Sequence, residues 1–162
     1  VAKKKEQEIS ESVRELILKA WRAGKNAYAP YSGFRVGAAL FAKSGRIYTG
    51  CNVESASFSP TCCAERTALC KAISEGERGF AAIAVVGVRE GEKDYGFCTP
   101  CGVCRKFLRE FCEEDFAVFL ASGKEDGAEA DFAETEKFTL GELLPHSCGG
   151  KNFCGEKGGK GL

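Results

Sequence analysis

The sequence has neither net charge nor a long hydrophobic run, and each absence argues against a class of protein. Its 23 Lys and Arg residues balance its 23 Asp and Glu residues. A chain without excess positive charge is not expected to hold a nucleic acid polymer, because that normally requires a basic patch. No segment approaches the roughly 18–20 consecutive apolar residues of a membrane span, so no membrane partner is expected.

The first residues also lack the apolar stretch and cleavage site of a secretory signal. This matters because the sequence contains ten cysteines. In a small secreted chain, an even number of cysteines suggests a disulfide framework. Without a secretion signal we instead expect a cytoplasmic location, where clustered cysteines more often bind metal or react than form disulfides.

The 162 residues, 44% of them apolar, suit one compact domain. We expect a flexible N-terminus over 1–8, a single domain over 9–147 and a Gly- and Lys-rich tail over 148–162. Hydrophobic spacing predicts helices over 9–25, over 61–76 with Thr61 as the N-cap, just after Pro100, and over 140–144. It predicts strands over 34–42, 47–53, 80–88, 116–121 and 133–138. The expected fold is therefore α/β, a three-layer α/β/α sandwich with a mixed five-stranded sheet.

Two short segments place cysteines at predicted helix starts, and the first of them also contains an acidic residue. The first contains Cys63 and Glu65, and the second contains Cys101 and Cys104. Because Cys101 and Cys104 are three residues apart in a first helical turn, both thiols point the same way. Three thiolates suit Zn²⁺ and leave a fourth tetrahedral position for water, as in catalytic zinc sites. Glu65 is then close to the metal without being a ligand, and is placed to take a proton from that water.

Two arginines follow these cysteines along the chain. Arg66 and Arg105, together with the positive ends of the two helices, should favour thiolates over thiols. Hydrogen bonds from either guanidinium to sulfur would also reduce the negative charge around the metal. We therefore expect Arg66 and Arg105 to support the metal ligands.

Other arrangements of the cysteines remain possible from the residues alone. A purely structural zinc site could be closed by a fourth thiolate, and six further cysteines are candidates: Cys62, Cys70, Cys98, Cys112, Cys148 and Cys154. Such a closed site would leave Glu65 without a purpose. The Cys-Ala-Glu spacing selects Cys63 over Cys62 as the ligand, and Cys62 is expected to be a core thiol.

A Cys-Ala-Glu followed by Pro-Cys-x-x-Cys is the signature of zinc-dependent deaminases with three thiolate ligands. Over about residues 9–147 the chain resembles the small, homotetrameric cytidine deaminases. Five blocks carry the resemblance, in the order typical of that family: YAPYSGFRVGAAL (28–40), GCNVE (50–54), CAERTA (63–68), PCGVCR (100–105) and GELLP (141–145).

The resemblance implies roles for five substrate-binding residues. Asn52 and Glu54 would hydrogen-bond the ribose hydroxyls, and Phe34 would lie against the pyrimidine. The backbone N–H of Ala64 would meet the base carbonyl at O2, and the Thr99 carbonyl would receive the exocyclic amine. Taken alone, Asn52 and Glu54 could instead be a turn cap and a solvated carboxylate. Phe34 taken alone would be interpreted as an ordinary core residue, and only the resemblance reverses that interpretation.

The resemblance also implies a homotetramer whose active sites are completed by neighbouring subunits. Two positions depart from the family pattern. His146 follows Pro145 where the family usually places a Phe that reaches the neighbour's base pocket, which leaves Phe153 as a possible substitute. Phe58 stands where the family often has Tyr, so that hydroxyl is missing.

The implied function is zinc-dependent hydrolytic deamination of cytidine and 2'-deoxycytidine, with one Zn²⁺ per subunit, in pyrimidine salvage. The implied partner is a free pyrimidine nucleoside rather than a nucleic acid polymer. Two alternatives are a deaminase of another aminated heterocycle, such as an aminonucleoside antibiotic, and a non-catalytic zinc-stabilised module.

Overall fold

The computed structural model describes residues 10–150, so the predicted flexible N-terminus and residues 151–162 of the predicted tail lie outside the described chain. Ten elements form the fold: α1 (Glu11–Gly24), β1 (Phe34–Ala42), β2 (Ile47–Cys51), α2 (Ala64–Ser74), β3 (Phe80–Arg89), β4 (Asp94–Tyr95), α3 (Gly102–Phe111), β5 (Ala117–Asp126), β6 (Glu129–Thr139) and α4 (Leu140–Leu143). No helix within the described residues is long and apolar enough to cross a membrane.

The strands form one mixed sheet, as predicted. Neighbouring strands follow the order β2-β1-β3-β5, with β6 beside β5 and the short β4 pairing with the second half of β5. Strand β3 runs parallel to β5, whereas β1 is antiparallel to both β2 and β3. All five predicted strands are present. The sheet has a sixth strand, β4, which was not predicted. A two-residue strand has no periodicity in the sequence and exists only through its pairing with β5.

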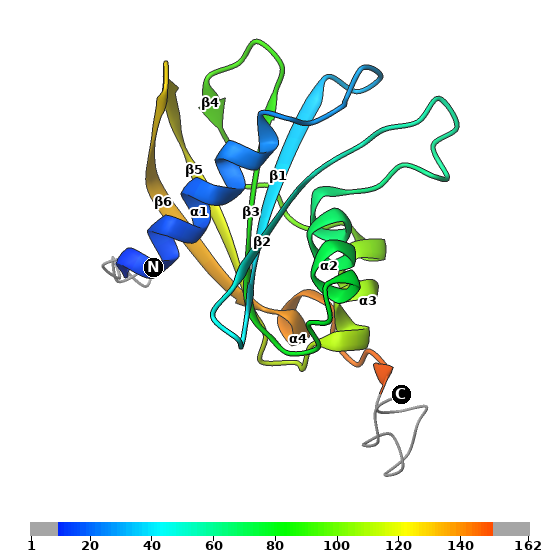
Figure 1. Cartoon of the computed structure of the whole chain (residues 1–162). Helices are drawn as coiled ribbons and strands as arrows, with labels where there is room; N and C mark the ends of the chain where they lie inside the picture. Colours follow the sequence, from blue (N-terminus) through cyan, green and yellow to red (C-terminus); the bar gives the residue numbers. More distant parts are fainter. Residues whose placement is uncertain (1–9, 151–162) are drawn as a thin grey trace.

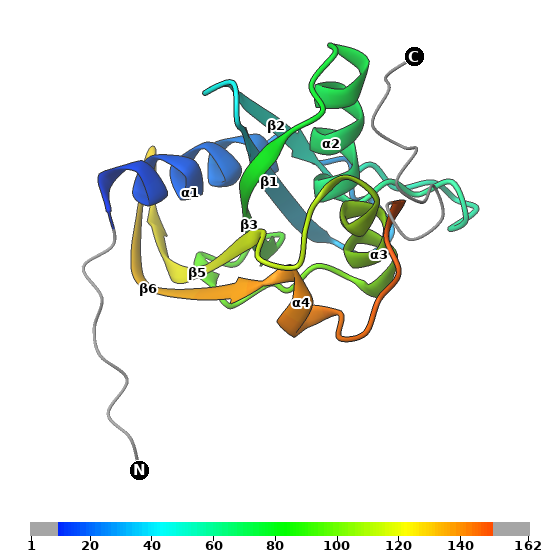
Figure 2. The same ribbon diagram turned by 90° about the horizontal axis from the view of Figure 1, so that it is seen from below.

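The sheet separates two hydrophobic layers (Figures 1 and 2). On one face, α1 buries Leu16, Ile17 and Trp21 against strand residues such as Val86. On the opposite face, α2 and α3 lie side by side and share the larger cluster. This arrangement is the predicted three-layer α/β/α sandwich, because a sheet with two apolar faces needs helices on both.

Two glycines allow the helices to approach the sheet closely. A Cβ at Gly37 of β1 would lie 1.9 Å from the carbonyl oxygen of Ala20 in α1. A Cβ at Gly50 of β2 would lie 2.4 Å from the amide nitrogen of Ala68 and 2.5 Å from the carbonyl oxygen of Ala64, both in α2. Any side chain at Gly50 would therefore displace the first turns of α2.

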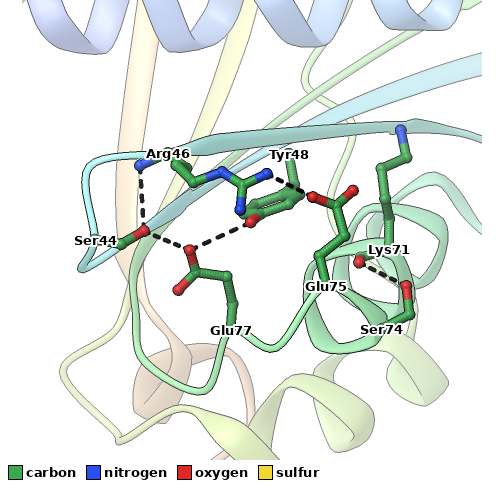
Figure 3. Close-up of polar contacts among 7 residues, drawn as sticks. All are labelled: Ser44, Arg46, Tyr48, Lys71, Ser74, Glu75 and Glu77. Carbon is green, nitrogen blue, oxygen red and sulfur yellow. Dashed lines mark hydrogen bonds and ion pairs between the residues drawn. The ribbon is translucent and has the colours of Figure 1, made fainter.

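A polar cluster fixes the other end of α2 to the β1–β2 turn (Figure 3). Arg46 pairs with Glu75, just past the helix. Glu77 accepts hydrogen bonds from Ser44 and, at 3.2 Å, from the Tyr48 hydroxyl. With Gly50 close to its first turns and this cluster at its last turn, α2 is held at both ends.

The boundaries of three elements, β5, β6 and α2, differ most from the prediction. Strands β5 and β6 extend past the core as a hairpin, paired from Ala117↔Thr139 to Asp126↔Glu129. Most of this outer hairpin is charged and exposed, so hydrophobic spacing shows only its inner part. Helix α2 begins at Ala64, with Cys63 rather than Thr61 as the N-cap, because Thr61 Oγ1 instead accepts a hydrogen bond from the Ser55 amide.

Candidate active site

The predicted site residues gather at one edge of the sheet. Phe34 begins β1, Asn52 follows β2, and β1 pairs there with the end of β3 through Phe34 and Arg89. Helix α2 also begins at this edge, after the end of β2. The start of α3 lies next to it, because the Sγ atoms of Cys63 and Cys101 are close together. Ligands in open α/β sheets commonly bind at such an edge, since strand ends and helix starts converge there.

The start of α2 presents Cys63 through a short backbone bridge. The Cys62 amide donates to the Val53 carbonyl at 2.9 Å, and the Val53 amide donates to the Cys62 carbonyl at 2.8 Å. This bridge holds the chain extended up to Cys63, whose carbonyl accepts the first helical hydrogen bond, from Thr67. The Cys62 thiol accepts a hydrogen bond from Thr67 Oγ1 and is not part of the metal-ligand cluster.

The start of α3 supplies the other two sulfurs. Cys101 is the N-cap and its sulfur accepts a hydrogen bond from the Cys104 amide at 3.5 Å. The Sγ atoms of Cys63 and Cys101 are 3.8 Å apart, and those of Cys101 and Cys104 are 3.5 Å apart. Zn–S bonds of about 2.3 Å in a tetrahedron place sulfurs about 3.8 Å apart, so the three thiols fit one zinc ion.

A fourth cysteine does not join these three within the described chain. Among residues 10–150, the three cysteines Cys63, Cys101 and Cys104 are the one group of His, Cys, Asp or Glu ligand atoms close enough to share a metal ion. Cys154 lies outside the described residues. Three protein ligands are typical of catalytic zinc sites, whereas structural sites are closed by four.

The surroundings of the cluster favour negative charge on Cys63. A hydrogen bond from Cys104, with further help from Arg66, lowers the pKa of the Cys63 thiol. The same contact with Cys63, together with burial, raises the pKa of Cys104. Arg66 also donates from Nη2 to the Thr61 carbonyl at 2.6 Å, which holds its guanidinium near the sulfurs.

Arg105 is placed differently from Arg66. It donates from Nε to the Pro100 carbonyl and from Nη1 to the Leu143 carbonyl, both at 2.7 Å. Its hydrogen bonds therefore join the start of α3 to α4. The predicted hydrogen bond from Arg105 to sulfur is not among these contacts.

Glu65 is a buried carboxyl group beside the thiols. It is the second residue of α2, and only 4% of its surface is exposed. Burial, together with the negative charge on Cys63, raises its pKa to about 7. A carboxyl group in such surroundings can exchange a proton near neutral pH.

Asn52 uses its side chain to hold the first residues of β1. Its Oδ1 accepts a hydrogen bond from the Val36 amide at 2.8 Å, and its Nδ2 donates to the Phe34 carbonyl at 2.9 Å. The amide group thus spans the backbone on both sides of Arg35. One N–H of the Asn52 amide is left for another acceptor.

Glu54 in turn holds the loop before β1. Its carboxylate accepts hydrogen bonds from the Tyr31 amide, the Ser32 amide and the Ser32 hydroxyl. The Ser32 hydroxyl, followed by the two amides, lowers the pKa of Glu54 below its ordinary value. Sequence reasoning assigned no role to Ser32, since its partner is 22 residues away.

The remaining predicted substrate contacts are Phe34, Ala64 and Thr99. Phe34 is half-buried at the start of β1, and Thr99, just before Pro100, is an exposed residue. Ala64 is fully buried at the first position of α2. Its N–H is one of the four at a helix start that have no partner within the helix, so it can donate to a ligand.

Comparisons with known proteins agree with this geometry. The family model for the cytidine and deoxycytidylate deaminase zinc-binding region matches residues 10–120. The chain belongs to this family. A cytidine deaminase from Sporosarcina psychrophila is 45% identical over 82% of the chain and 88% of its own length. One from Halalkalibacterium halodurans is 44% identical over 80% of the chain and 89% of its own length.

Solved structures of cytidine deaminases share the fold as well. The crystal structure of the cytidine deaminase from Burkholderia pseudomallei superposes with a TM-score of 0.70 at 40% identity. The match covers 83% of the present chain and 98% of that one. Membership of this hydrolase family identifies the chain as a zinc-dependent enzyme whose three-cysteine cluster lies in the zinc-binding region. The alternatives of an antibiotic deaminase and a non-catalytic module are not favoured.

Proposed function

We propose that this protein hydrolyses cytidine and 2'-deoxycytidine to uridine and 2'-deoxyuridine and releases ammonia, a reaction of pyrimidine salvage. The observation that carries the proposal is the buried carboxyl group of Glu65 beside a three-thiol metal site that lacks a fourth protein ligand within residues 10–150. A purely structural zinc site would have no use for such a carboxyl group. Family membership agrees with the same reaction.

In the proposed mechanism Glu65 carries protons between water and the base. Zinc, when bound at Cys63, Cys101 and Cys104, supplies Lewis acidity toward the attacking water. Glu65 takes one proton from that water and delivers it to N3 of the pyrimidine while the C4–O bond forms. Glu65 then transfers the second proton of the water to the amine. The C4–N bond breaks, ammonia departs and the C4 carbonyl forms.

The proposed substrate contacts come from residues at the same edge of the sheet. We propose that the free N–H of Asn52 and the carboxylate of Glu54 meet the ribose hydroxyls, and that the ring of Phe34 lies against the base. The Ala64 N–H is proposed to bind O2, and the Thr99 carbonyl to accept a hydrogen bond from the amine. Arg66 is proposed to support the sulfurs, whereas the contacts of Arg105 favour a role in holding α4.

The proposal is tested by following the ultraviolet absorbance of cytidine mixed with the zinc-loaded protein. Glu65→Gln should bind zinc normally and lose about 10²–10⁴-fold in kcat, because proton transfer is removed while shape is kept. Glu92→Gln, a matched change on the exposed β3–β4 turn, should leave kcat unchanged. Cys101→Ser should lose zinc, which elemental analysis would show. Near-normal turnover by Glu65→Gln would refute the mechanism.

We further propose a homotetramer as the working form. Several aromatic and aliphatic side chains are exposed close to the candidate site in the single chain: Tyr28, Tyr31, Val53, Phe58, Phe97 and Val103. Phe58 is the most exposed of these side chains, with 67% of its surface accessible to solvent. Large exposed apolar groups of this kind commonly mark subunit interfaces. Light scattering should give a mass of about 70 kDa, four times the 17.4 kDa of one chain.

We also propose a cytoplasmic location. All nine cysteines within residues 10–150 are free thiols. Three of them are needed as thiolates for zinc, and a reducing compartment maintains that state. Fractionation of cells that produce the protein should recover it with cytoplasmic markers, and recovery elsewhere would contradict the proposal.

A further inference from the structure

A hollow in strand β3 lies directly beneath the ring proposed to bind the base. Side chains alternate along β3, so Gly87 faces the same side of the sheet as Ile83 and Val85, the side covered by α2 and α3. Gly87 pairs with Val36 of β1, two residues from Phe34. Because Gly87 has no side chain, the sheet surface is open at this point.

Two side chains fill this opening. A Cβ built on Gly87 would lie 2.8 Å from Cε1 of Phe34 and 2.8 Å from Sγ of Cys98, with Cβ of Cys98 at 3.1 Å. Real Cβ atoms essentially never approach other heavy atoms closer than 3.0 Å. The ring of Phe34 and the thiol of Cys98 therefore occupy the space that any side chain at position 87 would need.

The backbone holds Cys98 in this place. An isolated antiparallel bridge joins Gly87 to Gly96, which fixes the segment before Pro100 against β3. Cys98 is half-buried and packs on the core shared with α2. Its thiol therefore stays in the opening over Gly87, together with the ring of Phe34.

We propose that Gly87 and Cys98 are positioning residues. They fix the position of the Phe34 ring and thereby set how closely the pyrimidine packs against that ring. This inference rests on the proposed function, in which Phe34 lies against the base. The hollow at Gly87 lets the ring lie close to β3, and the side chain of Cys98 fills another part of the same opening. A ring lifted by a methyl group would narrow the space left for the base.

The effect of filling the hollow should be steric. Gly87 has no positive φ, so Ala can adopt its backbone conformation without strain. The three atoms nearest to the added methyl group belong to the ring of Phe34 and the side chain of Cys98. We therefore expect Gly87→Ala to raise KM for cytidine about tenfold while kcat changes less than about threefold, since pocket shape and not proton transfer is altered.

Two double variants separate the proposed positioning of the ring from a general loss of structure. Phe34→Leu removes the ring, so Gly87→Ala should raise KM little further in that background. Cys98→Ala removes the sulfur that the new methyl group meets, so combining it with Gly87→Ala should restore part of the lost affinity. The matched control is Gly79→Ala at the opposite end of β3, because the atoms nearest to a Cβ there all belong to the flexible side chain of Lys43, the closest at 3.3 Å, and KM should stay unchanged.

The measurements are steady-state kinetics with cytidine, zinc content by elemental analysis, and crystal structures of the wild type and Gly87→Ala. If Gly87→Ala raises KM by the same factor in the wild type and in Phe34→Leu, the proposed positioning of the ring is wrong, while the proposed function is unaffected. An unmoved Phe34 ring in the Gly87→Ala crystal structure would overturn the proposed positioning independently of activity. A zinc-loaded wild type that does not deaminate cytidine would overturn the proposed function, and the role in substrate binding with it.

Discussion

Replacing Asn52 by Ala tests whether this residue supports the protein backbone as well as the substrate. Its side-chain amide bonds the Val36 amide and the Phe34 carbonyl, and only 8% of the residue is exposed. Alanine removes both partners and leaves a donor and an acceptor without hydrogen bonds in a mostly buried place. The free enzyme should therefore lose stability even without substrate.

The magnitude follows from the two backbone groups. A buried polar group left unpaired costs about 1–3 kcal/mol, and partial access of water at this edge reduces the total. We expect Asn52→Ala to lower the free energy of unfolding by about 2–4 kcal/mol, which corresponds to a fall in Tm of at least about 5 °C for a chain of this size. Asn52→Asp should also destabilise, since a carboxylate can accept from Val36 but cannot donate to the Phe34 carbonyl.

Thermal unfolding of the zinc-loaded protein, at one fixed protein concentration, measures this loss. Asn26→Ala is the matched control, because Asn26 is exposed in the turn after α1 and its replacement should leave Tm unchanged. If Asn52 contacts the ribose alone, Asn52→Ala will raise KM while Tm stays within about 1 °C of the wild type. That result would refute the supporting role.

Further predictions concern packing, pH and the metal. Gly50→Ala should cost about 1–3 kcal/mol of stability and weaken zinc binding, because its methyl group would push on Ala68 of α2; denaturation and zinc titration check this. Hydrogen bonds from Tyr95 and then Trp21 lower the pKa of Glu125 below its ordinary 4.5. The stability that Glu125 contributes is thus present above pH 4.5 and lost as pH falls through its folded-state value. Unfolding of Glu125→Gln should depend less on pH between about 6 and 3, and an unchanged pH dependence would contradict this. Removing zinc with a chelator should lower Tm, and added zinc should restore it.

Local patterns in the sequence predicted most of the framework. Apolar spacing located all five main strands and the helices, and the Cys-Ala-Glu and Pro-Cys-x-x-Cys segments identified the three thiols and Glu65. These features are local, since each depends on residues within one turn or one strand. The same reasoning missed β4, which exists only through pairing with the distant β5. It also missed the outer part of the β5–β6 hairpin, because that part is charged and exposed and shows no apolar spacing.

The sequence by itself determined which residues can do chemistry: three thiols and a carboxyl group at two helix starts. Only the tertiary structure decided their environment. Burial raises the pKa of Glu65, and the amide of Asn52 turns out to hold β1. The hollow at Gly87 seats the ring of Phe34. Each of these properties arises from atoms far apart in the chain, so no local spacing of residues could reveal it.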